Sequence, residues 1–190
     1  MKNILFGSLL FLFSCTDSSK TETVSTSSDT VLSIDTPVDI LPDTVIRNES
    51  KVESIRSIVQ SINEQNLLVQ TFTWNEPSCA DAGTIRYFLN GDEIVKVVET
   101  GFIGDGGWTK EYYYNKGKFI FSYDQYIGGP AGMPLDTNEV RIYMDADTLV
   151  LQRKNQDIVK GASKKITARS REYRILTALK TKDFGAALCN

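Results

Sequence analysis

The strongest constraint on the fold is a long stretch in which apolar and polar residues alternate. From Leu67 to Arg153 the apolar residues recur with a period of two, as in β-strands that bury one face. Asn90-Gly91 favours a tight hairpin turn, and Asn115-Lys116-Gly117 and Asp145-Ala146-Asp147 are two further short connections. These patterns predict seven strands, at residues 67–74, 84–89, 93–100, 108–114, 118–126, 139–144 and 148–153.

Helical patterns flank the strands on both sides. Ser50 and Glu53 form a capping box for a helix that ends near Gln65. Its apolar stripe consists of Val52, Ile55, Val59 and Ile62. A second helix is predicted over residues 164–181, with an N-cap at Ser163 or nearby. Its buried side would consist of Ile166, Tyr173, Leu176 and Leu179. Together these elements predict an α+β fold, an antiparallel meander sheet with the helices packed on one face.

In a meander, alternate connections lie at opposite ends of the sheet. The three short turns would share one end, and the longer connections 75–83, 101–107 and 127–138 would share the other. Binding residues concentrate on such connections. The candidates for a binding site are therefore Phe102, Asp105, Trp108, Tyr126 and Met133. The alternative is that the glycines serve long turns and that the aromatic residues pack in the core.

The first 14 residues have the proportions of a secretory signal peptide. Lys2 supplies a positive start, and the apolar run Ile4–Phe13 is too short to span a bilayer. The run ends in Leu12-Phe13-Ser14-Cys15, which resembles the bacterial lipobox. This resemblance implies that the signal is cleaved before Cys15 and that the Cys15 thiol carries lipid. The alternative is a buried N-terminal helix with a chance cysteine.

Residues 15–49 are predicted to be a tether and residues 50–190 a single folded domain. Of the 34 residues 16–49, 13 are Ser or Thr, and such a stretch buries too little apolar surface to fold. The expected location is the outer membrane of a bacterial envelope, on either its periplasmic or its surface face. With Cys15 lipidated, Cys79 and Cys189 remain as an even pair for a disulfide in an oxidising compartment. Two free thiols are the alternative.

The chain has no histidine, which excludes Ser-His-Asp and Cys-His nucleophile activation and histidine-containing zinc sites. No spacing resembles a calcium loop, so no metal, cofactor or catalytic residue is predicted. Four carboxylates fall in the long connections, where a pair could serve as a glycosidase acid and base: Glu76, Asp81, Asp105 and Asp136. Residues 151–190 carry 10 basic and 3 acidic side chains. This basic segment is expected either to contact an anionic partner or to form a solvated helix face. Nucleic acid is not expected outside the cytoplasm.

The segment 111–121, with Tyr112-Tyr113, a turn, Gly117-Lys118 and alternating aromatics, resembles a hairpin pattern of uncharacterised bacterial cell-envelope lipoproteins. The resemblance covers residues 84–153. It implies an antiparallel sheet and carries no activity. The leading hypothesis is a non-catalytic envelope lipoprotein that binds a protein or glycan partner. The alternatives are a small glycan hydrolase that uses loop carboxylates and an inhibitor of a lytic enzyme such as lysozyme.

Overall fold

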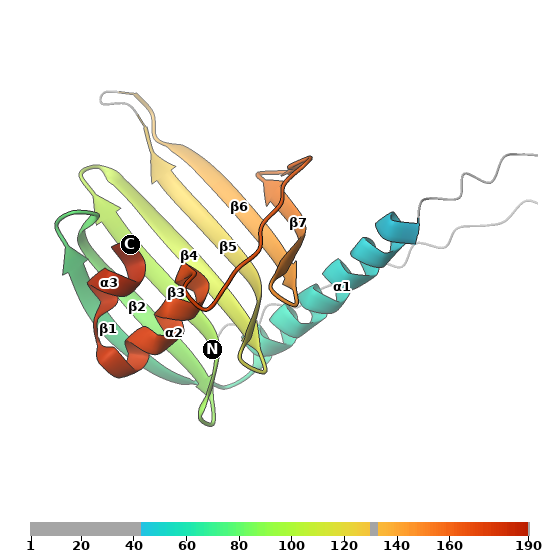
Figure 1. Cartoon of the computed structure of the whole chain (residues 1–190). Helices are drawn as coiled ribbons and strands as arrows, with labels where there is room; N and C mark the ends of the chain where they lie inside the picture. Colours follow the sequence, from blue (N-terminus) through green and yellow to red (C-terminus); the bar gives the residue numbers. More distant parts are fainter. Residues whose placement is uncertain (1–42, 130–132, 190) are drawn as a thin grey trace, which may run out of the picture. The chain divides into compact units, whose positions relative to one another are not determined.

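The alternating stretch forms one antiparallel sheet of eight strands in sequence order, β1-β2-β3-β4-β5-β6-β7-β8, so the predicted meander is confirmed (Figure 1). All seven predicted strands are present, and the eighth is a short addition that pairs with β7. The strands are β1 (Leu68–Glu76), β2 (Ala80–Asn90), β3 (Glu93–Ile103), β4 (Gly106–Asn115), β5 (Lys118–Gly128), β6 (Asp136–Asp145), β7 (Thr148–Lys154) and β8 (Asp157–Ile158).

The structure is a computed structural model of the chain that describes residues 43–129 and 133–189. These residues belong to one compact unit. The predicted signal peptide, the lipidated Cys15 and most of the predicted tether lie outside the described residues.

The three short turns lie at the same end of the sheet, here called the near end. Gly91 and Gly117 have φ of 60° and 70°, a left-handed conformation that glycine adopts without steric cost. A β-bulge lies beside each of the three turns, as at Tyr113/Tyr114. This bulge places Tyr114 opposite Phe119 and Tyr113 opposite Phe121, so the two phenylalanines point to different faces of the sheet.

The connections at the opposite end, here called the far end, are shorter than predicted. The glycine-rich stretch 101–107 was expected to form a loop, but only Gly104 and Asp105 separate β3 from β4. Gly101 pairs with Trp108, and Ile103 pairs with Gly106, within the strand ladder. Glycine lowers β-propensity without preventing backbone pairing, which is why composition alone misplaced these strand ends.

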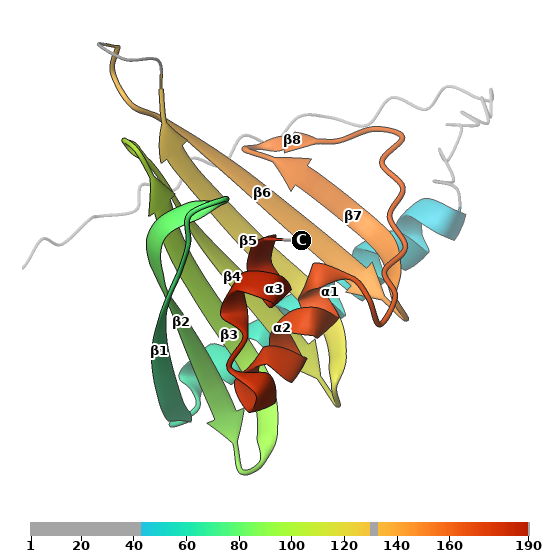
Figure 2. The same cartoon turned by 60° about the vertical axis from the view of Figure 1, so that its left-hand side comes forward.

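The helices cover both faces of the sheet, so the prediction of helices on one face was wrong (Figures 1 and 2). Helix α1 (Asp43–Glu64) packs on the face that carries Tyr113 and Phe121, here called the α1 face. Helices α2 (Arg171–Thr181) and α3 (Phe184–Cys189) pack on the face that carries Tyr114 and Phe119, here called the α2/α3 face. Both faces are apolar here because the bulges send successive aromatic residues to opposite sides. The domain therefore has two hydrophobic cores, one on each face of the sheet.

Two helix starts differ from the predicted ones. Helix α1 begins at Asp43 rather than at Ser50, within the segment expected to be tether. The C-terminal helix begins after Ser170 rather than after Ser163. The residues before it run along the sheet, where the Leu149 amide donates to the Lys164 carbonyl at 2.9 Å. This hydrogen bond and the burial of Ile166 hold the segment in an extended conformation, although its sequence pattern is typical of a helix.

Candidate functional site

Two tryptophans and two glycines form a row across four strands at the far end. Trp74 pairs with Gly83, Gly83 with Gly101, and Gly101 with Trp108. A Cβ on Gly101 would lie 2.2 Å from the Trp108 ring, and one on Gly83 would lie 2.6 Å from Trp74 Nε1. The glycines therefore let both indoles lie against the sheet on the α2/α3 face, with ring centroids 6.4 Å apart.

On the α1 face of the same strands lies a groove of about 570 Å³, here called the far-end groove. Helix α1 packs on the near half of this face, and strand alternation turns the groove side chains toward the uncovered half. The Thr84 and Thr100 hydroxyls are hydrogen-bonded at 2.8 Å on its floor. Its side chains include Thr73, Asn75, Ala82, Thr84, Thr100 and Phe102. The lining is mainly small and polar, with one exposed aromatic ring.

Of the four predicted acid/base carboxylates, Asp81 alone lines the far-end groove. Its Oδ2 accepts a hydrogen bond from the Gly104 amide at 2.9 Å, which fixes the β3–β4 turn against β2. Glu76 accepts a hydrogen bond from Ser78 at 3.3 Å, and Asp136 accepts one from the Thr137 amide at 2.9 Å. Since no second carboxylate lines the groove, a carboxylate pair for hydrolysis has no support there.

The far end also carries exposed apolar side chains on both faces of the sheet, here together called the far-end patch. Phe102 is 49 % exposed and Met133 is 64 % exposed. Strand pairing places Phe102 and Ile127 on the α1 face, because both pair with Gly107, and Tyr126 on the α2/α3 face, because it pairs with Trp108. The patch consists of Phe102, Ile103, Tyr126, Ile127, Met133 and Leu135.

The structure separates the five predicted binding residues. Phe102, Tyr126 and Met133 belong to the far-end patch, and Asp105 is exposed in the turn beside it. Trp108 is only partly exposed, and its Nε1 donates to Glu99 Oε1 at 2.7 Å. Trp108 is therefore a packing residue under the C-terminal helices, which corresponds to the alternative that the sequence left open.

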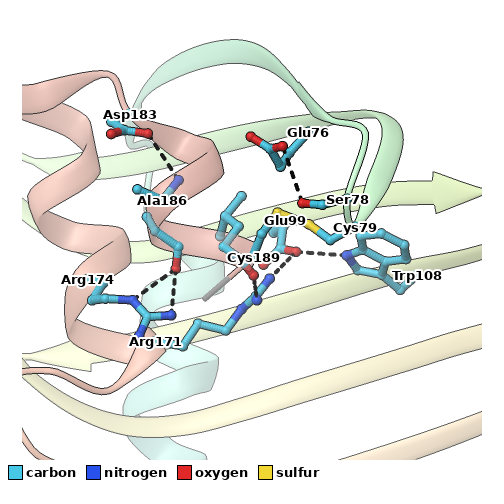
Figure 3. Close-up of a disulfide and its surroundings, with 12 residues drawn as sticks. Glu76, Ser78, Cys79, Glu99, Trp108, Arg171, Arg174, Asp183, Ala186 and Cys189 are labelled. Carbon is cyan, nitrogen blue, oxygen red and sulfur yellow. Dashed lines mark hydrogen bonds and ion pairs between the residues drawn. A yellow bond between two sulfur atoms is a disulfide. The ribbon is translucent and has the colours of Figure 1, made fainter.

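A buried carboxylate, Glu99, ties the C-terminal helices to the sheet (Figure 3). Its side chain is fully buried and pairs with Arg171 Nη2 at 2.6 Å. It also accepts hydrogen bonds from Trp108 and, at 3.2 Å, from the Tyr112 hydroxyl. Arg171 Nη1 donates to the Leu188 carbonyl, so one guanidinium joins β3 to the end of α3. Sequence reasoning missed this pair; the available signal was a charge at an inward position of β3, two residues after Val97.

The Cys79–Cys189 disulfide lies beside this ion pair, with Cα atoms 5.8 Å apart (Figure 3). The chain reverses at Lys182, whose φ is 59°, and α3 packs back against α2 and β1. The disulfide and the Glu99–Arg171 pair close the α2/α3 face at the far end, so the α1 face is the open one there.

A partly buried carboxylate, Asp124, predicts a pH-dependent stability. Burial raises the pKa of Asp124 above its ordinary value of 3.8, and the Lys110 charge opposes this shift. Its Oδ1 is buried without a partner among the described residues. Because its folded-state pKa is raised, Asp124 costs the fold stability as pH rises above 3.8, and the cost is complete once pH exceeds the folded-state pKa.

We therefore expect Asp124→Asn to be more stable than the parent at pH 7, with the difference shrinking as pH falls toward 3.8. Urea unfolding at several pH values measures this difference. Asp136→Asn, at an exposed position, is the control and should show no such trend. A stability gain that grew on acidification would contradict the sign.

No protein-family model, curated protein or solved structure matches the chain. None of the helices described between residues 43 and 189 is long and apolar enough to span a membrane. The described residues also contain no group of three or more Cys, Asp or Glu side chains arranged to hold a metal ion.

Proposed function

We propose that this chain is a lipid-anchored, non-catalytic binding module of the bacterial cell envelope, with a protein as its partner. The observation that carries the binding role is the far-end patch, where Phe102, Ile103 and Met133 are about half exposed or more. Exposed apolar side chains on one face of neighbouring strands, such as Phe102 and Ile127, are typical of protein interaction sites. The lipobox-like Leu12–Cys15 and the Ser/Thr-rich segment after it support the anchor and the tether.

The composition of the far-end patch favours a protein over a glycan. Sugar-binding sites offer open aromatic faces, but both tryptophans pack inward in the cluster beneath the C-terminal helices. The ring of Tyr126 has Lys110 Nζ at 5.2 Å from its centroid. The acidic Asp81 and Asp105 flank the patch, so a partner surface with an apolar centre and basic rim would complement it.

Phe102→Asp is expected to abolish capture of the partner. The full-length chain would be used to recover proteins from envelope extracts of its own host, with Val69→Asp as the matched control. The side chain of Val69 is 44 % exposed and that of Phe102 is 49 % exposed. Val69 lies on the α1 face close to the short turns, at the opposite end of the sheet from Phe102. A central aromatic residue of an interface contributes about 2 kcal/mol or more, so recovery should fall at least about tenfold for Phe102→Asp only.

Thermal unfolding of both variants would establish that each is folded. Two results would contradict the proposal: a folded parent chain that captures no protein, or equal recovery by the parent and by Phe102→Asp.

A further inference from the structure

A second groove, here called the α1–β8 groove, opens between the first half of α1 and strands β7 and β8. Its volume of about 570 Å³ falls in the range of small-molecule sites. Leu151, Arg153 and Ile158 line it from the sheet, and Val52 lines it from the helix. Strand pairing places Ile158 directly opposite Arg153. The groove therefore has an apolar floor, with Arg153 on its sheet side and Arg56 on its helix side.

Arg153 is a cation without a carboxylate partner among the described residues. It lies opposite Arg141 on the neighbouring strand, a like-charge pair that is unfavourable by itself. Arg141 is compensated by Glu139, at 2.7 Å. Arg153 Nη1 donates only to the Gln156 carbonyl, at 3.4 Å, and its buried Nε has no acceptor. Glu139 thus compensates Arg141 only. The positive charge of Arg153 has no carboxylate partner among the described residues at the α1–β8 groove.

The acidic residues at the rim do not cancel this charge. Glu53 is 75 % exposed and already pairs with Arg56 at 3.5 Å. Glu49 is also exposed. Solvent screens such exposed charges strongly, whereas the partly buried Arg153 is screened less. The charge at the groove floor therefore favours the binding of an anion.

We propose that the α1–β8 groove binds a single-chain amphiphile with a carboxylate head, such as a long-chain fatty acid. Arg153 Nη2 makes no hydrogen bond among the described residues and, unlike Nε, is not buried, so it can donate to the carboxylate head. The apolar chain then lies along Val52, Val150, Leu151 and Ile158. This site is separate from the far-end patch, so the proposal does not depend on the proposed function.

Calorimetric titration of the full-length chain with dodecanoate, below its micelle-forming concentration, tests the proposal. We expect one dodecanoate to bind per chain and dodecanol, which has the same tail and no charge, to bind about tenfold more weakly. Arg153→Gln should weaken dodecanoate about tenfold and leave dodecanol unchanged. Ile158→Glu should also weaken dodecanoate, because its carboxylate would pair with Arg153 from the opposite strand position. It should weaken dodecanol as well, because Ile158 lines the path of the apolar tail.

Arg86→Gln is the control, since Arg86 is an exposed cation on the α1 face of β2 and does not line this groove. Its dodecanoate affinity should equal that of the parent. The proposal is overturned if the folded parent does not bind dodecanoate, if dodecanol binds as tightly, or if Arg86→Gln loses as much affinity as Arg153→Gln.

Discussion

Glu99→Gln is expected to lower the free energy of unfolding by about 3 kcal/mol, because it leaves the guanidinium of Arg171 without its charge partner in a buried site. Glu99 is fully buried, and three donors converge on it from Arg171, Trp108 and Tyr112. The amide that replaces the carboxylate presents one acceptor oxygen and an NH₂ group that cannot accept from these donors. The measurement is urea unfolding at pH 7.

Glu139→Gln is the matched control for this substitution. The Glu139–Arg141 pair has almost the same length, 2.7 Å, and its arginine is equally exposed, at 28 %. Its carboxylate is 26 % exposed rather than fully buried, so the loss should be much smaller than for Glu99→Gln. Equal losses for the two substitutions would show that burial of Glu99 does not set the strength of its pair.

Removal of the disulfide with Cys79→Ser and Cys189→Ser is expected to lower the free energy of unfolding by about 4 kcal/mol. The two cysteines are 110 residues apart in the sequence, so the bond closes a long loop and restricts the unfolded chain strongly. For a chain of this size the melting temperature should fall by about 10 °C.

The check is unfolding with and without a thiol reductant. Reductant should destabilise the parent to the level of the double variant and should not affect the variant itself. A parent that unfolds at the same denaturant concentration in both conditions would refute a stabilising disulfide.

The fold was largely predictable because it depends on local patterns. Period-two alternation identified seven strands, and Asn90-Gly91 identified a hairpin turn that has the expected positive φ. The meander and the two flanking helices followed from element order. The placement of helices on opposite faces did not follow, because it depends on where single bulge residues such as Ile120 reverse the side-chain alternation.

The candidate sites were less predictable, because they depend on residues brought together from distant strands. Phe102, Tyr126 and Met133 were identified from glycine-rich stretches, and all three are exposed at the far end. The Glu99–Arg171 pair joins residues 72 positions apart and leaves no trace in local spacing. Arg153 was part of an ordinary strand pattern, and its missing partner becomes apparent only when Arg141 is placed opposite it.

The central claim is that this domain works at a membrane to which Cys15 anchors it. Intact-mass measurement of the protein purified from the membranes of its own host tests this most directly. The account predicts a chain that begins at Cys15 and carries the added mass of its acyl chains, with Cys15→Ala absent from the membrane fraction. A chain that begins at another residue, or an unmodified Cys15, would contradict it.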